Sequence, residues 1–469
     1  MGYIRIFDHS FRPPPLFLIA VESIALVVAA YLGVHLRFSG SVTLDDNLVN
    51  LWSKALVFAV VLSLCTLAMR VYDSGLREGY AGILLRTTVA YALLGCAALT
   101  ILYYLFPSMY LGRGVLAIAV SIAMIIMLVL RFIYYRTIGA AGIKRRVLIL
   151  GSGQRASQIE ETLNSNRESV EIIGFLQDPQ GEPLISTARL LEKNQPLIDI
   201  VRQFRVDELV VALDDRRAAD GGYFPADELL ECKLSGVSVL DAINFYERET
   251  EKVELSMLRP SWMIFSEGFR FSALRDVAKR GFDIIASLLL LLVTWPLMLL
   301  TAIAIKFEDG LGSPVIYHQT RTGRLSKPFE LLKFRSMRPD AEQDGAQWAQ
   351  ENDDRVTKIG RLTRELRLDE LPQIYNVLRG DMSFVGPRPE RPEFVEQFVS
   401  EIPFYDARHR VKPGLMGWAQ LCYPYGASID DAAQKLRYDL YYIKNHNILF
   451  DLRILIQTIE VVLLGKGVR

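Results

Sequence analysis

The run "FDIIASLLLLLVTWPLMLLTAIAI", from Phe282 to Ile305, decides how the second half of the chain meets a membrane. It is long enough to cross a bilayer core, which needs about 20 helical residues. Pro296 lies in its middle, where a proline removes a helical hydrogen bond and clashes with the preceding turn. Basic residues flank both ends, namely Arg275, Lys279 and Arg280 before it and Lys306 after it. Because positive charge stays on the cytoplasmic face, we expect a re-entrant helix over residues 270–306 that bends near Trp295-Pro296. The alternative is a kinked spanning helix, which would place the following residues outside the cell.

Four further apolar runs occupy the first 136 residues. They lie near residues 16–36, 55–69, 87–106 and 114–130, each with almost no internal charge. Lysine and arginine are concentrated before the first run, between the second and third, and after the fourth. This asymmetry predicts a four-helix transmembrane domain over residues 1–140, with both its N-terminus and the rest of the chain in the cytoplasm. The alternative is a set of buried helices in a large soluble protein.

Length and composition limit the remaining possibilities. The 469 residues exceed one ordinary core and indicate several domains. The formal net charge is zero, so we expect no nucleic acid partner. The four cysteines lie far apart, with neither a disulfide framework nor a zinc-binding spacing, which is typical of a reducing compartment.

Residues 141–258 read as a Rossmann-like cytoplasmic domain. A buried strand, "RVLILG", is followed by "GSGQRA", which places Gly151, Gly153 and Ala156 at the spacing of a dinucleotide-binding loop. Strands then alternate with helices, which predicts a parallel sheet. Asp178 ends the second strand, where a ribose-binding acid could lie. Because neither a Tyr-x-x-x-Lys motif nor a catalytic histidine follows, two interpretations stay open: a nucleotide-binding module and a structural or regulatory one.

The stretch "RLDELPQIYNVLRGDMSFVGPRPE", from Arg367 to Glu390, carries the chemistry. Arg364 and Arg367 are three residues apart and share a helix face just before the adjacent acids Asp369 and Glu370. Pro372 suits the start of a new helix, so we expect the helix N-terminus to hold the Asp369 carboxylate ionised. The alternative is a simple helix cap with solvated neighbours. Arginines and a proline-rich turn around the acids instead favour an anionic substrate, phosphate with magnesium.

Four motifs resemble the signature blocks of the bacterial polyprenyl-phosphate sugar-phosphate transferases, the monotopic phosphoglycosyl transferases. These motifs are "KFRSM", "LDELPQIYNVLRGDMSFVGPRP", "KPGLMGWAQ" and "LRYDLYYIKNHNILFDLRIL". The resemblance covers about residues 275–469, and the preceding parts resemble the long form of that family. It implies a four-helix transmembrane bundle, a Rossmann-like parallel α/β domain, a re-entrant helix and a small mixed α/β catalytic domain over residues 307–469.

The resemblance also implies the activity and the site. Asp369 and Glu370 match the catalytic dyad, and Asp369 would attack the β-phosphate of a UDP-sugar, such as UDP-glucose or UDP-galactose. UMP would leave, and undecaprenyl phosphate would then take the sugar phosphate from the enzyme. Magnesium would be held partly by Asp369. The matching phosphate-binding residues are Arg364, Arg388, Lys333 and Arg335, with Asp439 and Arg367 as further candidates. The family implies an inner-membrane enzyme of exopolysaccharide synthesis and allows a homodimer.

Two positions depart from the family pattern. Trp295 stands where the family usually has serine before the proline, and Met416 stands where threonine is common.

Two other functions compete with sugar-phosphate transfer. A regulator or scaffold of polysaccharide assembly would tolerate Asp369→Asn. A nucleotide-sugar dehydratase or oxidoreductase would need a bound nicotinamide cofactor.

Overall fold

The structure is a computed structural model that describes residues 4–6, 9–11, 13–38, 50–69, 84, 86–138, 145–164, 170–177, 183–186, 189–214, 224–258, 263–264, 266, 268–269, 272–310, 312–338, 354–423, 426 and 428–464. The chain divides into two compact units, Met1–Phe245 and Tyr246–Arg469. Asp178, the predicted ribose-binding acid, lies outside the described residues.

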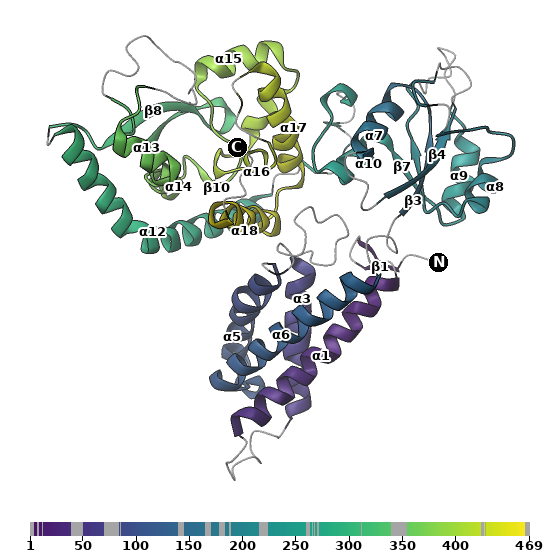
Figure 1. The fold of residues 1–469 in the computed structure, drawn as a ribbon, viewed down its shortest axis with the longest axis horizontal. Coiled ribbons are helices and arrows are strands. Elements are labelled where there is room, and N and C mark those ends of the chain that lie inside the picture. The colour runs from purple at the N-terminus through teal and green to yellow at the C-terminus, as the bar shows by residue number, and fades with distance from the viewer. Residues whose placement is uncertain are drawn as a thin grey trace. The chain divides into compact units, whose positions relative to one another are not determined.

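The first unit begins with long apolar helices that run side by side (Figure 1). They are α1 (Pro13–Phe38), α3 (Leu51–Ala68), α5 (Cys96–Leu105), which continues a π-helical turn at Val89–Gly95, and α6 (Arg113–Ile138). Three stretches are long and apolar enough to cross a membrane, and α3 is slightly shorter. The prediction of four apolar N-terminal helices is confirmed, and their membrane character rests on length and composition.

A buried ion pair joins α1 to α6. Both side chains, Glu22 and Arg131, are only 1–2% exposed. The guanidinium is bidentate, with Nε 2.7 Å and Nη2 2.9 Å from the two carboxylate oxygens, and it also donates to Thr87. Because charges inside an apolar bundle are costly unless they are paired, this contact fixes the relative position of the two helices.

The second part of this unit is a parallel sheet with the strand order β5-β4-β3-β6-β7. The strands are β3 (Arg145–Leu150), β4 (Val170–Leu176), β5 (Leu190–Leu191), β6 (Glu208–Val211) and β7 (Ser238–Asp241). Alternate β3 side chains face opposite cores. One core includes α7 (Gln154–Asn164) and the start of α10 (Ala242–Thr250), and the other includes α8 (Leu197–Gln203) and α9 (Ala226–Leu234) (Figure 1). The predicted Rossmann-like arrangement is confirmed.

The second unit contains the long helix α12, Ala273–Asp309, with Pro296 inside it. Figure 1 shows that its ribbon is bent. Large apolar side chains along it are exposed, including Ile285, Leu289 and Leu292 at 59–69%. A helix that exposes so much apolar surface suits a lipid environment. Its re-entrant path stays a prediction.

The rest of the second unit is a small mixed α/β domain. A hairpin of β8 (Ile316–Thr322) and β9 (Pro328–Phe334) precedes α13 (Lys358–Glu365), and α14 (Gln373–Arg379) follows. The short strands β10 (Ser383–Val385) and β11 (Gly414–Met416) then pair in parallel. The covering helices are α15 (Pro392–Glu401), α16 (Trp418–Cys422), α17 (Ile429–Asn445) and α18 (Ile448–Leu464). The hairpin and the two parallel strands bring segments distant in sequence to one place, where the site forms.

Candidate active site

The adjacent acids Asp369 and Glu370 lie in a single 3-10 turn, Leu368–Glu370, between α13 and α14. Arg367, directly before the turn, adopts the left-handed conformation with φ 58°, which ends the run of α13 and redirects the chain. Pro372 stands at the N-cap of α14, as the sequence predicts. This sharp reversal holds both carboxyl groups between two helices.

Glu370 is surrounded by cations. Its Oε1 lies 2.9 Å from Arg388 Nη2 and 3.5 Å from Lys333 Nζ, and its Oε2 lies 3.8 Å from Arg367 Nη1. Burial alone would raise the pKa of this carboxyl, but Arg388, Lys333 and Arg367 outweigh burial and lower the pKa. Glu370 is therefore ionised and holds cations from three segments around the dyad.

Asp369 is in a different environment. It is 7% exposed, and its Oδ1 is buried with no hydrogen-bond partner among the residues that the structure describes. Burial and the neighbouring Glu370 raise its pKa, and Lys333 and Arg364 offset this only in part. Burial thus opposes the expected effect of the helix N-terminus, and an ionised Asp369 carboxylate stays a prediction. Leaving a buried acceptor unpaired costs about 1–3 kcal/mol, and such a group is a candidate for direct contact with a ligand.

The predicted phosphate-binding residues lie at several depths around the dyad. Lys333 extends from β9, and burial lowers its pKa while Glu370 opposes that effect. Arg335 follows β9 and is buried. Arg364 ends α13 and donates from Nε to Ser336 Oγ at 2.9 Å. Arg367 is mostly exposed at the rim. Positive charge thus reaches the dyad from the hairpin, from α13 and from the loop that carries Arg388.

Asp439 lies behind the site rather than in it. It is buried on α17 with its Oδ2 2.9 Å from Arg408 Nη2. The same guanidinium donates to the backbone carbonyl of Arg388 at 2.9 Å and to Tyr405. Asp439 and Arg408 therefore position the loop that carries Arg388. Sequence reasoning missed Arg408, because nothing in its local pattern indicates its partners.

The start of α12 also positions this loop. Asp283 accepts hydrogen bonds from Ser383 Oγ and Phe384 N, both at 2.9 Å, so it holds β10 directly before the Arg388 loop. Lys279 donates to the carbonyl of Val385 at 3.0 Å. The spacing of Lys279 and Asp283, four residues apart at the start of an apolar run, is a signal that could have identified them.

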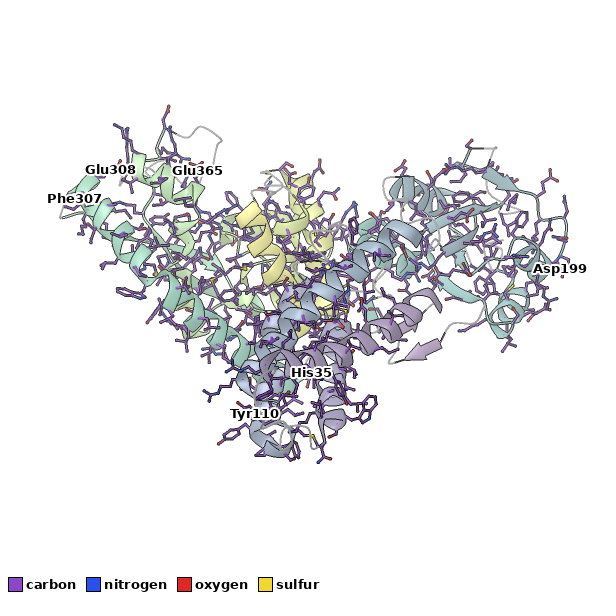
Figure 2. The ribbon with its side chains drawn as sticks, turned by 60° about the horizontal axis from the view of Figure 1, so that its bottom comes forward. His35, Tyr110, Asp199, Phe307, Glu308 and Glu365 are labelled. Carbon is purple, nitrogen blue, oxygen red and sulfur yellow. The ribbon has the colours of Figure 1, made fainter. Side chains whose placement is uncertain are left out.

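Both helices beside the dyad are held by α12. Arg280 donates to the last carbonyls of α14, Val377 O and Leu378 O, at 2.5 Å each. At the other end of α12, Glu308 accepts from the first backbone N–H groups of α13, at 2.8 Å from Lys358 and 3.1 Å from Ile359 (Figure 2). A cation at the C-terminal end of a helix and an anion at its N-terminal end both stabilise the helix dipole. Helix α12 therefore forms part of the frame of the site.

The described residues contain no group of three or more histidine, cysteine, aspartate or glutamate side chains that could hold a metal by themselves. Magnesium, however, is often bound by one or two carboxylates together with substrate phosphates. The unpartnered Oδ1 of Asp369 meets that requirement. Glu370 does so less well, because its oxygens already face cations.

The glycine loop of the middle domain is occupied by the chain itself. The Asp214 carboxylate accepts from the backbone N–H groups of Gln154 at 2.7 Å and Arg155 at 3.0 Å. A β-carbon on Gly153 would lie 2.0 Å from Asp214 Oδ2, so the glycine is needed for this internal contact. Gly151 has φ +128°, and Ala156 is buried in the core. The carboxylate takes the place where a dinucleotide phosphate would be expected at a helix N-terminus.

This contact makes Asp214→Ala informative. We expect backbone amide exchange at Gln154 and Arg155 to become about fivefold faster, because losing a cap costs about 1 kcal/mol. Hydrogen-exchange mass spectrometry measures this, and Asp214→Asn, which keeps an acceptor, is the control. We also expect no binding of NADH or coenzyme A to the wild-type loop in calorimetry. Binding that protects these two amides would contradict the assignment.

Comparisons with known proteins agree with the motifs. A family model described as "Bacterial sugar transferase" matches residues 274–465, and one described as "CoA-binding domain" matches residues 68–219. A UDP-N-acetylgalactosamine-undecaprenyl-phosphate N-acetylgalactosaminephosphotransferase from Aeromonas hydrophila is 42% identical over 60% of this chain, and the chain covers 63% of that protein. An undecaprenyl-phosphate glucose phosphotransferase from Komagataeibacter xylinus is 32% identical over 78% of this chain and 68% of its own length. An undecaprenyl-phosphate galactose phosphotransferase from Salmonella typhimurium is 28% identical over 81% of this chain and 80% of its own length.

The first family model covers most of the predicted catalytic domain, and the last two relatives match over most of the chain. They confirm the resemblance drawn from the four motifs. The chain belongs to the bacterial sugar transferases, as a long-form polyprenyl-phosphate sugar-phosphate transferase.

Proposed function

We propose that this protein transfers a sugar 1-phosphate from a UDP-hexose to undecaprenyl phosphate and releases UMP. The observation that carries the proposal is the buried, unpartnered Oδ1 of Asp369 beside a cation-bound Glu370. The relatives act on undecaprenyl phosphate with glucose, galactose or N-acetylgalactosamine, which supports the same donor class here. The product, undecaprenyl-diphosphate-sugar, would start exopolysaccharide synthesis.

In the first step, an oxygen of the ionised Asp369 attacks the β-phosphorus of the UDP-sugar. The bond from that phosphorus to the bridging oxygen breaks, and UMP leaves with the oxygen and its electron pair. An aspartyl sugar-phosphate remains on the enzyme. Burial makes Asp369 a stronger nucleophile once it is ionised, because water no longer solvates the charge. Arg364 and Lys333 supply positive charge where the diphosphate must lie.

In the second step, a phosphate oxygen of undecaprenyl phosphate attacks the phosphorus of the adduct. The bond to Asp369 breaks, and the carboxylate is regenerated for the next cycle. Glu370 would hold Arg388 and Lys333 in place for both steps, because they lie 2.9 Å and 3.5 Å from its Oε1. No proton transfer is required in either step, since the nucleophiles are anions.

Magnesium would be held by Asp369 together with the substrate phosphates. When bound, it would neutralise diphosphate charge and so ease the departure of UMP. The frame that α12 provides would keep the site at headgroup level, where a soluble nucleotide and a lipid phosphate can meet. The family resemblance implies the bacterial inner membrane, and the distribution of lysine and arginine favours a catalytic domain in the cytoplasm.

The direct test is UMP release from a panel of UDP-sugars, with protein in nanodiscs, magnesium and undecaprenyl phosphate. We expect UMP from one donor, such as UDP-glucose, UDP-galactose or UDP-N-acetylgalactosamine, and loss of that signal on chelation. If folded protein released no UMP from any donor, the regulator or scaffold interpretation would replace this proposal.

The pH dependence gives a separate prediction for Arg364→Gln. Asp369 must be ionised to attack, so the rate falls as pH drops through its pKa. Arg364 lowers that pKa. Its removal should therefore shift the acid limb of the kcat/KM profile to higher pH and reduce the rate about 100-fold. The control is Arg361→Gln on the same helix. An acid limb that does not move would show that Arg364 does not act on Asp369.

A further inference from the structure

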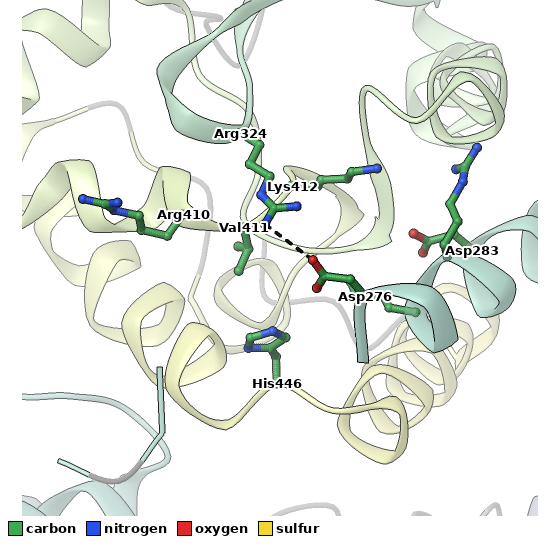
Figure 3. Close-up of a pocket in the computed structure, with 9 residues that line it drawn as sticks. Asp276, Asp283, Arg324, Arg410, Val411, Lys412 and His446 are labelled. Atoms are coloured by element: carbon green, nitrogen blue, oxygen red, sulfur yellow. Dashed lines mark ion pairs between the residues drawn. The ribbon is translucent and has the colours of Figure 1, made fainter. Parts of the chain in front are cut away.

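A second cationic pocket lies away from the dyad, between the first turns of α12 and the loops before β11 (Figure 3). Five of its lining side chains are basic, namely Lys279, Arg280, Arg324, Arg410 and Lys412. Two are acidic, Asp276 and Asp283. The lining itself therefore carries an excess of three positive charges when all these groups are ionised, although Asp451 outside it pairs with Lys279 at 2.6 Å.

The two acidic side chains are already counted in this excess, and each has a partner of its own. Asp283 is engaged by β10 through Ser383 and Phe384. Asp276 lies 3.6 Å from Arg324, the ion pair drawn in Figure 3. Lys412 neither donates a hydrogen bond nor forms an ion pair with the described residues, and burial and Arg280 lower its pKa. A cation without a partner in a partly buried pocket is costly unless an anion joins it.

Two of the cations converge on one point. Arg280 Nη2 and Lys412 Nζ each lie 3.6 Å from the position that a β-carbon on Gly380 would take. Arg280 also donates to the carbonyls of Val377 and Leu378, and Gly380 has no side chain to fill the space beside these two cations. Arg324, whose Nε is buried without a hydrogen-bond partner, faces the same pocket.

The pocket also lies next to exposed apolar surface of α12. The same turns of α12 expose Leu274 and Val277, and further large apolar side chains are exposed from Ile285 onward. If α12 enters the bilayer, the pocket opens at the level of the phospholipid headgroups. Basic pockets beside membrane helices on the cytoplasmic side bind anionic lipid headgroups.

We propose that this pocket binds the phosphate of an anionic headgroup through Lys412, Arg324 and Arg280. The ligand chemistry is a phosphate ester that carries net negative charge. Its occupancy would hold the start of α12, and therefore β10, against the membrane surface. The site is distinct from Asp369 and Glu370 and needs no catalysis to be tested.

The test uses the full chain in detergent, with retained lipid counted by native mass spectrometry. We expect phosphatidylglycerol to bind more tightly than phosphatidylcholine. The double variant Lys412→Met with Arg324→Gln should weaken phosphatidylglycerol binding about thirtyfold, because it removes two positive charges. Lys412→Arg should keep binding, and Lys358→Met, outside the pocket, should change nothing. Circular dichroism establishes that each variant is folded.

A second arm separates a lipid from a soluble ligand. If the phosphate group alone is enough for binding, calorimetry should show weak binding of inorganic phosphate and of glycerol 1-phosphate to the wild type. The double variant should not bind either of them. Phosphatidylglycerol binding without binding of either soluble ligand would assign the site to lipid. Equal binding of phosphatidylglycerol by wild type and by the folded double variant would overturn the proposal, whatever the enzyme's activity.

Discussion

Asp369→Asn should reduce UMP release by about 10⁴-fold or more, which is the scale for removing a catalytic nucleophile. The amide keeps the size of the carboxylate but cannot form the aspartyl phosphate. Because Asp369 is buried and its Oδ1 has no partner among the described residues, the change removes little from the fold. The measurement is UMP formation with the preferred donor in nanodiscs.

Asp430→Asn is the matched control, since Asp430 is exposed on α17. It should release UMP at the wild-type rate. If Asp369→Asn retained activity within tenfold of wild type, the reaction class could stand but Asp369 would not be the nucleophile.

Arg408→Met should strongly destabilise the catalytic domain. It leaves the buried Asp439 without its partner at 2.9 Å, and breaking such a pair costs about 3–5 kcal/mol. Burial already raises the pKa of Asp439, with Arg408 as the main opposing charge. The carbonyl of Arg388 also loses its donor. We therefore expect a lower melting temperature in detergent and a loss of activity.

The double variant Arg408→Met with Asp439→Leu separates two effects of Arg408. One is the neutralisation of the buried Asp439 carboxylate, and the other is the positioning of the Arg388 loop. Replacing both charges with apolar groups should restore much of the stability. Activity should stay low, because the Arg388 loop still lacks its donor. Full recovery of activity in the double variant would show that Arg408 does not position Arg388.

The sequence predicted local elements well, because periodicity and turn residues act over short distances. The alternation of strands and helices identified the parallel sheet, and Pro372 marked the start of α14. The adjacent acids and the arginine spacing identified Asp369, Glu370 and Arg364 as a cluster, and the structure places them together.

The sequence could not reveal effects that depend on packing between distant segments. The raised pKa of Asp369 follows from burial beneath the hairpin and helices, which no local pattern encodes. The pairing of Asp439 with Arg408 joins residues 31 positions apart, so no local pattern showed it, and Asp439 was a site candidate only from the family resemblance. Asp214 filled the glycine loop from 60 residues away in the sequence. In each case the partner became visible only in three dimensions.

The proposed two-step mechanism requires a covalent intermediate at Asp369, and one experiment detects it directly. Wild-type protein is mixed with the preferred UDP-sugar and magnesium, without undecaprenyl phosphate, then quenched and digested for mass spectrometry. We predict a burst of about one UMP per enzyme and a sugar-phosphate mass on the peptide that contains Asp369. The contradicting result is UMP release that begins only when undecaprenyl phosphate is added, with no modified peptide. That result would indicate direct transfer of the sugar phosphate instead of a two-step mechanism.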